Sequence, residues 1–500
     1  MDARRTENMI FCLSGSNKRA QKALRHRYNA KWSSRQFFDE RCLNFGSFSP
    51  PSRDDNPVIT LATLGSSKRR ADIYIKAEGN DIARVHCALV VNYKTGVFLV
   101  EDRSSGDTRV YQNPEGKTNR MPTSGDQRRV IVTKGFNTVL DMGKNPRKSV
   151  KFTFLWNMDP EQTLAVINRR LSGVSKNILK AGYVDFPSQM TFDRSEPIVH
   201  FPVNELGSGG YGRVWRTIDA HSGDIFAVKI LNPPAFEGDP SWARRAKRSQ
   251  LREVSYVRGL RHPNILPVLA SQGWETGNLE IFVPLMQGSL WNLIYGRNMN
   301  PDVAEIAYPA LVHALAAIDY LDLQGLVHRD IKPENILYRH DGKSYHFVVS
   351  DFGTLNYAEV AKTGIGTMMY FAPEINLKHL PQTSRVDVWS LFVSMLLIHD
   401  EVFRWEGTEL AKNLIDLSRF IVNSALNNPK LRYIREMGIW DPKFRATAGQ
   451  ILVNLGRVDL ISNPVTPLGE DHFERWLEHV RTSNDEYSNM YRGLVRSKRN

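Results

Sequence analysis

The hydrophobic pattern changes twice along this chain of 500 residues, and these changes limit its fold more than any other feature. Residues 58–156 hold short apolar or alternating runs separated by Gly, Asn, Asp and Ser, which is typical of an all-β sandwich. Residues 200–265 resemble strands around a glycine turn, and residues 300–460 follow mostly helical spacing. The sequence therefore predicts a multidomain chain, an all-β sandwich followed by an α+β bilobal fold with a small β-rich lobe and a larger α-rich lobe.

The changes of pattern also set the expected domain boundaries. Residues 1–56 mix basic residues with Ser, Asn and Pro, which predicts a flexible basic arm. Asp159 and Pro160 predict the start of a connecting helix. The predicted strand runs are 58–61, 72–76, 86–91, 97–100, 130–133, 138–142 and 150–156. The predicted divisions are the arm at 1–56, the sandwich at 57–157, the connecting helix or linker at 158–197, the bilobal domain at 198–465 and a C-terminal helical tail at 466–500.

The charge and cysteine content bear on the compartment. The 66 Lys and Arg residues exceed the 53 Asp and Glu residues, and residues 1–200 hold the whole excess, with 33 basic against 20 acidic side chains. Cys12, Cys42 and Cys87 are too few and too scattered for a disulfide framework or a zinc site. The longest apolar stretches, such as 391–398, are far short of a membrane span. We expect a soluble intracellular protein without membrane contact, in the nucleus or cytoplasm, with the nucleus slightly favoured by the basic clusters.

A glycine-rich turn and an isolated lysine mark the first candidate site. The loop 207–212, Gly-Ser-Gly-Gly-Tyr-Gly, joins two strand-like segments, and its glycines let backbone N–H groups approach phosphate oxygens. The absence of a following helix argues against a dinucleotide fingerprint. Lys229 lies within the apolar run 226–230, where burial is costly without an anion. Glu253, in a helix-like segment, is the candidate protein partner of this lysine.

Three further motifs follow in order. They are Val327-His328-Arg329-Asp330-Ile331-Lys332-Pro333-Glu334-Asn335, then Asp351-Phe352-Gly353, then Ala372-Pro373-Glu374. With the glycine loop and the lysine, this ordered set resembles that of eukaryotic-type protein kinases over residues 198–465. Chance does not account for both the order and the spacing of the motifs.

The resemblance implies an ATP- and Mg²⁺-dependent phosphotransfer site. Asp330 would accept the proton of the substrate hydroxyl. Asn335 and Asp351 would bind magnesium, which prefers hard oxygen ligands. The implied nucleotide-binding set is Gly207, Ser208, Gly209, Gly210, Gly212, Val214, Ala227, Lys229, Glu253, Val283, Met286, Asn335 and Asp351. In this set Val283 and Met286 belong to the hinge between lobes, where Pro284 departs from the usual pattern.

The resemblance also indicates the class of acceptor and a form of regulation. Lys332 and Thr367 match serine/threonine kinases, in which both side chains reach the catalytic aspartate. Arg329 before Asp330 marks kinases that are regulated through the activation segment, here 351–374. Thr363 lies where the family often carries an activating phosphothreonine, whose phosphate would pair with Arg329. Glu374 and Arg445 match the structural ion pair of the larger lobe, and Asp387 matches the residue that braces the catalytic loop.

The predicted sandwich resembles a forkhead-associated domain, a fold that recognises phosphothreonine. His86, Asp102 and Thr108 fit the family pattern. Three positions depart from it: Ser66 replaces the phosphate-binding arginine, Ala83 replaces a serine, and Gly106-Asp107 replaces an asparagine–glycine turn. The neighbouring Lys68, Arg69 and Arg70 are candidates to replace the missing donors or are ordinary solvated charges. The order of the two domains resembles checkpoint-effector kinases, so a phosphorylated partner and a transient homodimer for trans-phosphorylation are expected with the Ser/Thr protein substrates.

Two other functional classes remain as alternatives. A pseudokinase or scaffold would retain the fold as a docking module, but such chains usually lose the lysine or the aspartates that are present here. A nucleic-acid-binding protein is suggested by Arg25, Arg27, Tyr28, Lys31 and Trp32, which interleave charge with aromatic rings. No recognised nucleic-acid module surrounds these residues, so nucleic acid is not the expected partner.

Overall fold

The structure is a computed structural model. The chain forms two compact units, residues 1–207 with 213–230 and residues 208–212 with 231–500. It describes residues 9–37, 40–45, 58–76, 81–111, 118–120, 128–134, 136–158, 162–163, 197–209, 212–231, 257–273, 279–296, 302–352, 368–375, 382–483 and 492.

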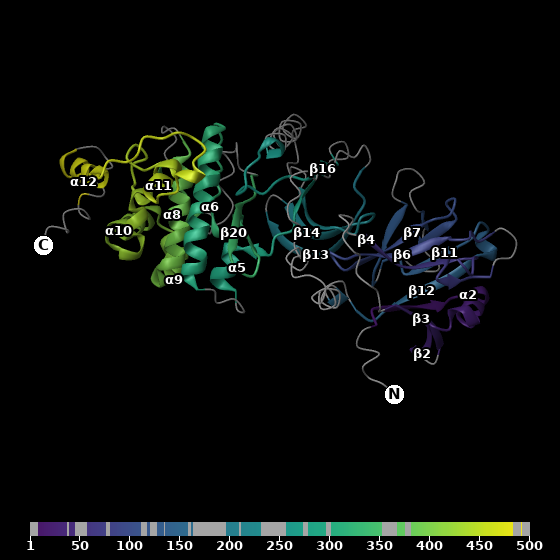
Figure 1. Cartoon of the computed structure of the whole chain (residues 1–500). Helices are drawn as coiled ribbons and strands as arrows, with labels where there is room; N and C mark the ends of the chain where they lie inside the picture. The colour runs from purple at the N-terminus through teal and green to yellow at the C-terminus, as the bar shows by residue number, and fades with distance from the viewer. Residues whose placement is uncertain are drawn as a thin grey trace, which may run out of the picture. The chain divides into compact units, whose positions relative to one another are not determined.

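The first unit begins with a front domain, residues 9–158, in which two sheets enclose one core (Figure 1). The first sheet contains, in spatial order, β2 (Ser33–Phe37), β3 (Glu40–Phe45), β1 (Phe11–Gly15), β12 (Val150–Trp156), β11 (Val139–Met142), β8 (Thr108–Tyr111) and β9 (Thr118–Arg120). The second sheet contains β10 (Arg129–Val132), β7 (Val97–Asp102), β6 (Cys87–Asn92), β4 (Val58–Gly65) and β5 (Ile73–Tyr74). The short helices are α2 (Lys18–Leu24), η1 (Arg27–Asn29) and η2 (Pro146–Lys148).

Each of the seven predicted strand runs contains or overlaps a strand, from β4 to β12. Their apolar side chains meet between the sheets, as the rings of Phe11 in the first sheet and Phe98 in the second show, with centroids 5.0 Å apart. Alternation along each strand directs one set of side chains into this core. The arrangement is compatible with the expected β-sandwich.

The residues before the sandwich differ from the flexible arm predicted for 1–56. β1 lies between β3 and β12, in register from Phe11 opposite Trp156 to Gly15 opposite Phe152. The Asn17 side chain accepts a bond from the Ala20 N–H, which caps α2, and donates to the Ser149 carbonyl. The reason for the difference is burial: a short apolar segment completes the first sheet between β3 and the distant β12.

Three further strands complete the first unit. They are β13 (His200–Gly209), β14 (Gly212–Asp219) and β15 (Ile225–Leu231), which lie in that order in one sheet. A turn with Gly223 at φ +73° joins β14 to β15. The connecting helix predicted within 158–197 lies almost entirely outside the described residues.

The second unit is mostly helical. Its α-helices are α5 (Leu290–Tyr295), α6 (Val303–Leu323), α8 (Arg385–His399), α9 (Glu401–Leu410), α10 (Leu414–Asn427), α11 (Ala448–Asn454) and α12 (His472–Thr482). Its 3₁₀ segments are η4 (Pro333–Asn335), η5 (Pro373–Ile375), η6 (Pro429–Gly438) and η7 (Val458–Leu460). Its strands are β16 (Ala270–Gln272) and β17 (Glu280–Pro284), which pair, and the sheet β18 (Gly288–Ser289), β19 (Ile336–His340) and β20 (Tyr345–Val349).

Two apolar helices form the centre of this unit (Figure 1). α8 buries 13 of its 15 residues, and α6 is apolar around most of its circumference, as expected of helices inside a core. α6 is long and apolar enough to cross a membrane by length and composition, which differs from our reading of short apolar stretches. Its apolar side chains are packed in the core. Within the predicted C-terminal tail, α12 buries Phe473, Trp476, Leu477 and Val480.

Candidate active site

Asp387 of α8 binds the backbone of the catalytic-loop segment 327–332. Asp387, in the first turn of α8, accepts bonds from the backbone N–H groups of His328 at 2.8 Å and Arg329 at 2.7 Å. Burial raises the pKa of Asp387, while His328 and the two N–H donors act in the opposite direction. Arg329 has φ +66°, an uncommon conformation for a residue with a side chain. Asp387 therefore has the bracing geometry expected of it and offsets part of this backbone strain.

Asp330, Lys332 and Asn335 form one hydrogen-bonded group. The Lys332 ammonium donates to Oδ1 of Asp330 at 3.0 Å and to Oδ2 at 2.8 Å. Asn335 Nδ2 donates to the carbonyl of Asp330 at 2.8 Å and to its Oδ2 at 2.9 Å. Asp330 is 8% exposed, and two side chains fix its carboxylate. Such a group can orient a hydroxyl and accept its proton.

The same asparagine is suited to a hard cation. Because Nδ2 of Asn335 is used by Asp330, the remaining Oδ1 is the acceptor available to a metal ion. The asparagine backbone carbonyl accepts bonds from the N–H and the hydroxyl of Ser350, which directly precedes Asp351. Asp351 has φ +63°. One amide oxygen and one carboxylate, both hard donors, fit the chemistry of Mg²⁺.

His328 and Phe352 support this arrangement, although sequence analysis assigned no role to either of them. His328 Nδ1 accepts the N–H of Asp330 at 3.3 Å, and the other ring nitrogen lies 3.0 Å from the Ser350 carbonyl. The Phe352 ring lies 5.0 Å from the His328 ring and is buried. The imidazole therefore connects the catalytic loop to the strand that leads to Asp351. Its place beside Asp330 in the motif was the available signal.

Two further side chains, in η4 and at the start of α5, differ in what surrounds them. Glu334 is exposed, and desolvation by the surrounding protein raises its pKa, with Lys332 acting against this and Asp330 with it. Ser289, which stands where many kinases have a second acid, is the N-cap of α5 and forms a capping box with Asn292. The hydroxyl is thus used to start a helix.

The ion pair expected between Glu374 and Arg445 is present and fully buried. Arg445 Nη1 lies 2.6 Å from Oε1 of Glu374, and Nη2 lies 3.1 Å from Oε2. The guanidinium also donates to the carbonyls of Ile439, Arg385 and Trp440. This pair is a structural part of the larger lobe rather than of the reaction site.

The predicted nucleotide-binding residues lie in both units. Gly207 lies in the exposed part of β13, and a Cβ there would meet nothing within 4 Å. Gly212, at φ +151°, has a conformation that favours glycine. Val214 on β14 is half-buried, whereas Ala227 on β15 is 5% exposed. Lys229 lies two residues further along β15 and is half-buried. Ser208 and Gly209 close β13.

In the second unit, Val283 lies on β17 and Met286 directly after it, both half-buried. The next residue, Gln287, exchanges side-chain bonds with the backbone of His340, at 2.6 and 3.2 Å. This contact ties the hinge to β19. The predicted residues that lie outside the described part of the chain are Gly210, Glu253, Thr363 and Thr367.

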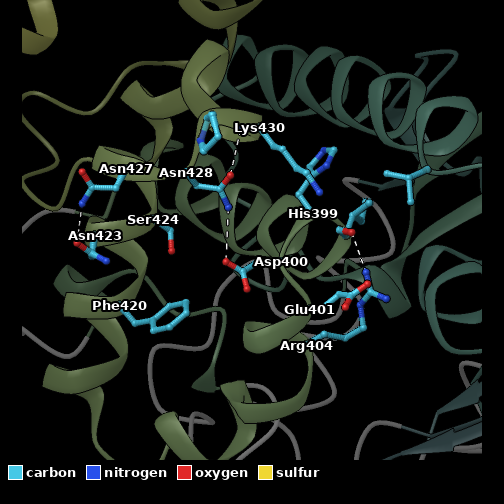
Figure 2. A pocket seen from close by; sticks show the side chains of 13 residues that line it. His399, Asp400, Glu401, Arg404, Phe420, Asn423, Ser424, Asn427, Asn428 and Lys430 are labelled. Atoms are coloured by element: carbon cyan, nitrogen blue, oxygen red, sulfur yellow. Dashed lines mark hydrogen bonds between the residues drawn. The ribbon is translucent and has the colours of Figure 1, made fainter.

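A separate hollow lies on the α-rich unit, with a volume of about 720 Å³ (Figure 2). His399, Asp400 and Arg404, near the α8–α9 junction, and Lys430 are among its lining residues. Asp400 caps α9 by accepting the Phe403 N–H, and the Arg404 guanidinium donates to carbonyls at the end of α8. None of the kinase-motif residues lines this hollow, and the polar groups of Asp400 and Arg404 satisfy helix ends.

The predicted phosphate-binding face of the front domain is built differently from its expected pattern. His86 is fully buried: Nδ1 accepts the Ala83 N–H at 3.1 Å, and Nε2 lies 3.3 Å from the Asp107 carbonyl. Ser66 donates to the carbonyls of Ile82 and Ala83, so its hydroxyl is used inside the loop. Asp102 accepts from the Thr108 hydroxyl at 2.6 Å. These residues stabilise the loops.

Basic side chains remain exposed beside these loops. They are Lys68, Arg69, Arg70 and Arg84. Lys68 Nζ lies 4.8 Å from the ring centroid of Tyr28 and 5.3 Å from that of Tyr74. The structure thus brings Tyr28, from the expected arm, next to the basic loop.

The fold and the motif geometry define a protein kinase, and comparison with known proteins agrees. The model of the protein kinase domain matches residues 202–454, and the chain belongs to this family. Among its relatives, serine/threonine-protein kinase dkf-1 of Caenorhabditis elegans is 30% identical over 220 residues, 43% of this chain and 29% of that protein. Mitogen-activated protein kinase 13 of Bos taurus is 30% identical over 201 residues, 39% of this chain and 51% of that protein.

A third relative is the ovarian-specific serine/threonine-protein kinase Lok of Drosophila melanogaster, 27% identical over 262 residues, 50% of this chain and 54% of that protein. The chain thus spans between 29% and 54% of the length of these three relatives. The family match, over residues 202–454, supports the expected bilobal kinase fold.

Proposed function

We propose that the protein is a serine/threonine kinase that transfers the γ-phosphoryl group of Mg-ATP to protein hydroxyls. The observation that carries this proposal is the group formed by Asp330, Lys332 and Asn335, in which Lys332 contacts both carboxylate oxygens. Lysine at this position is the serine/threonine pattern, and each relative described above is named a kinase, two of them serine/threonine kinases.

In the proposed reaction Asp330 orients the acceptor hydroxyl and takes its proton. Lys332 offsets negative charge between the carboxylate and the transferred group, and Asn335 fixes the carboxylate through Nδ2. Asn335 and Asp351 would hold Mg²⁺, which neutralises charge on the phosphate oxygens. Lys229, with Glu253, would hold the inner phosphates, and Ala227 and Val214 would contact the adenine. The retention of Lys229, Asp330, Asn335 and Asp351 argues against the scaffold alternative.

The test is phosphorylation of a degenerate peptide array by the full chain, followed by phosphoamino-acid analysis. Asp330→Ala should abolish the signal, whereas Lys343→Ala, an exposed control in the β19–β20 turn, should leave it unchanged. Signal on serine and threonine is expected. Equal labelling by wild type and Asp330→Ala would refute the enzyme assignment, and labelling of tyrosine alone would refute the acceptor class.

We also propose that phosphorylation of Thr363 activates the enzyme through Arg329. The support is the position of Arg329, whose backbone is held at φ +66° and whose Nε is buried without a hydrogen-bond partner among the described residues. A phosphate is the acceptor that a guanidinium in this state binds well. Intact-mass measurement of active enzyme should show phosphate on Thr363. Full activity of enzyme that is unmodified at this residue would contradict the proposal.

For the front domain we propose a forkhead-associated-like module that docks on a phosphorylated partner protein. The support is the two-sheet arrangement, the His86 contacts and the exposed basic residues beside the loops. Since Ser66 does not offer its hydroxyl, Arg69 and Arg70 would supply the charge-assisted donors. In titrations with phosphothreonine peptides, the affinity of the double variant Arg69→Ala plus Arg70→Ala should be at least tenfold lower than that of the wild type. The affinity of Lys144→Ala, an exposed control, should not change. Equal affinities would reject these donors.

A further inference from the structure

The outer face of the second sheet in the front domain is unusually apolar. On β6 the core-facing Cys87, Leu89 and Val91 alternate with Ala88 and Val90, which point to the other side and are 0% and 1% exposed. Antiparallel sheets commonly keep one face in water, with polar residues on it. Both faces of this sheet are therefore covered.

Strands of the kinase domain cover this outer face. Ala88, Val90, Val97, Leu99 and Ile131 form one buried cluster with Ile218 of β14. Phe201 of β13 and Ile225 of β15 are packed against that cluster. The Phe201 ring stacks on Phe136 of the front domain with centroids 4.4 Å apart. All these residues belong to the first unit.

The β14–β15 turn is also held by hydrogen bonds from the front domain. Thr95 Oγ1 donates to the Gly223 carbonyl at 2.7 Å, and Asn92 Nδ2 donates to the Ser222 carbonyl at 3.1 Å and to Asp224 Oδ1 at 3.0 Å. The Ile131 N–H donates to the Ala220 carbonyl at 2.8 Å. The front domain therefore contacts the hairpin through hydrogen bonds to the turn as well as through apolar side chains.

Gly223 shows how close the approach is. Its φ of +73° favours glycine, and a Cβ at this position would lie 3.2 Å from Leu99 Cδ1 and 3.4 Å from Val97 Cβ. A branched or aromatic residue would therefore press the turn away from the sheet, whereas an unbranched Cβ first meets the ends of the Leu99 and Val97 side chains. Internally, the Asp219 carboxylate accepts the N–H groups of His221 and Ser222, so the turn is a stiff body.

We propose that this outer face is a docking surface for the kinase's own β14–β15 hairpin, and that nucleotide affinity depends on the contact. The reason is continuity: the docked turn ends at Asp224, and β15 then carries Ala227 and Lys229 within five residues. A paired strand transmits the position of its turn to these residues. The front domain is therefore a positioning element for the nucleotide site, and its attachment there does not depend on any phosphorylated partner.

The first test locks the contact in the full chain. In the double variant Val97→Cys plus Gly223→Cys, the 3.4 Å spacing is close to the about 3.5–4.5 Å found between Cβ atoms in disulfides. The test is run in a Cys12→Ala background, because the buried thiols of Cys12 and Cys42 lie in hydrogen-bond contact, and the two single variants control for the substitutions. Mild oxidation should give an intrachain bond in the double variant alone. Failure to form that bond would overturn the docking.

The second readout is affinity for a fluorescent ATP analogue, which rests on the proposed function only through nucleotide binding. The oxidised double variant should bind within twofold of its reduced form. Leu99→Asp should raise Kd at least tenfold, while Thr60→Asp, at an exposed position of β4 in the same sheet, should leave it unchanged. A locked form that binds tenfold more weakly, or a folded Leu99→Asp variant with wild-type Kd, would overturn the proposal. If the wild-type protein binds the ATP analogue but transfers no phosphoryl group, the kinase assignment is refuted instead.

Discussion

Glu374→Ala should destabilise the α-rich unit strongly because of the way Arg445 is satisfied. The five N–H donors of this guanidinium all have acceptors: two bonds go to Glu374, at 2.6 and 3.1 Å, and three to backbone carbonyls. Both side chains are at most 1% exposed. The alanine would leave two donors and one positive charge buried without a partner.

Removal of one partner from such a pair costs about 3–5 kcal/mol. At about 2–4 °C per kcal/mol, the melting temperature of the second unit should fall by roughly 6–20 °C. The cost arises in the folded state, because in the unfolded chain Arg445 is solvated in both proteins. Arg445→Lys should recover little of the loss, since an ammonium cannot reproduce the fork of donors.

The assay is thermal unfolding of the full chain, followed by hydrogen exchange of α8 amides so that the transition of the second unit is identified. The matched control is Asp459→Ala, which breaks an exposed pair whose two N···O distances to Arg457 are both 2.9 Å. Solvent screens that pair, so the control should melt like the wild type. If both variants lower the transition equally, burial is not the cause and the reasoning fails.

Three other perturbations follow from the same structure. Lys332→Ala should lower kcat about 100-fold and leave the Kd of ATP unchanged, because its ammonium contacts only the Asp330 carboxylate among the described side chains; a change confined to Kd would contradict this role. Burial, with His346 and Arg457, lowers the pKa of His313 to about 4 from 6.5, so the unfolded chain binds the proton first. The free energy of unfolding should therefore fall as pH drops from 6.5 to 4, with a shallower loss in His313→Gln. Equal slopes of the denaturation midpoint against pH in the two proteins would exclude this contribution of His313. Gly65→Ala would place a Cβ 2.3 Å from the Arg84 carbonyl oxygen and should cost the front domain about 1–3 kcal/mol, so an unchanged melting transition would contradict the packing.

Sequence reasoning worked where local pattern and chemistry coincide. The seven runs became strands because their side chains alternate and their ends carry turn residues. Asp330, Lys332 and Asn335 meet as expected because four residues of backbone separate them at most, so their spacing already limits their geometry. The Asp387 brace spans 58 residues and could be predicted only from the resemblance to kinases.

Contacts over long sequence distances were harder to predict. β1 is a short apolar segment of a kind found in many loops, and one of its partner strands, β12, is about 140 residues away. The docked outer face did leave a signal: Ala88 and Val90 are apolar where a solvated strand would alternate to polar. Which segment covers that face depends on Ile218 and Gly223, whose own environment shows no such pattern.

The central place of β1 has a consequence for synthesis of the protein. β1 pairs with β12, whose last residue is Trp156, so the sheet cannot close until some 140 further residues have been made. At about 5–20 residues per second, the β12 side of this apolar strand waits roughly 7–30 s on the ribosome without its partner, although β3 is made earlier. Slower translation before residue 156 lengthens that exposure. The yield of folded kinase should therefore respond to chaperone supply and to codon choice in the stretch that encodes residues 11–156, which is translated well before the catalytic residues.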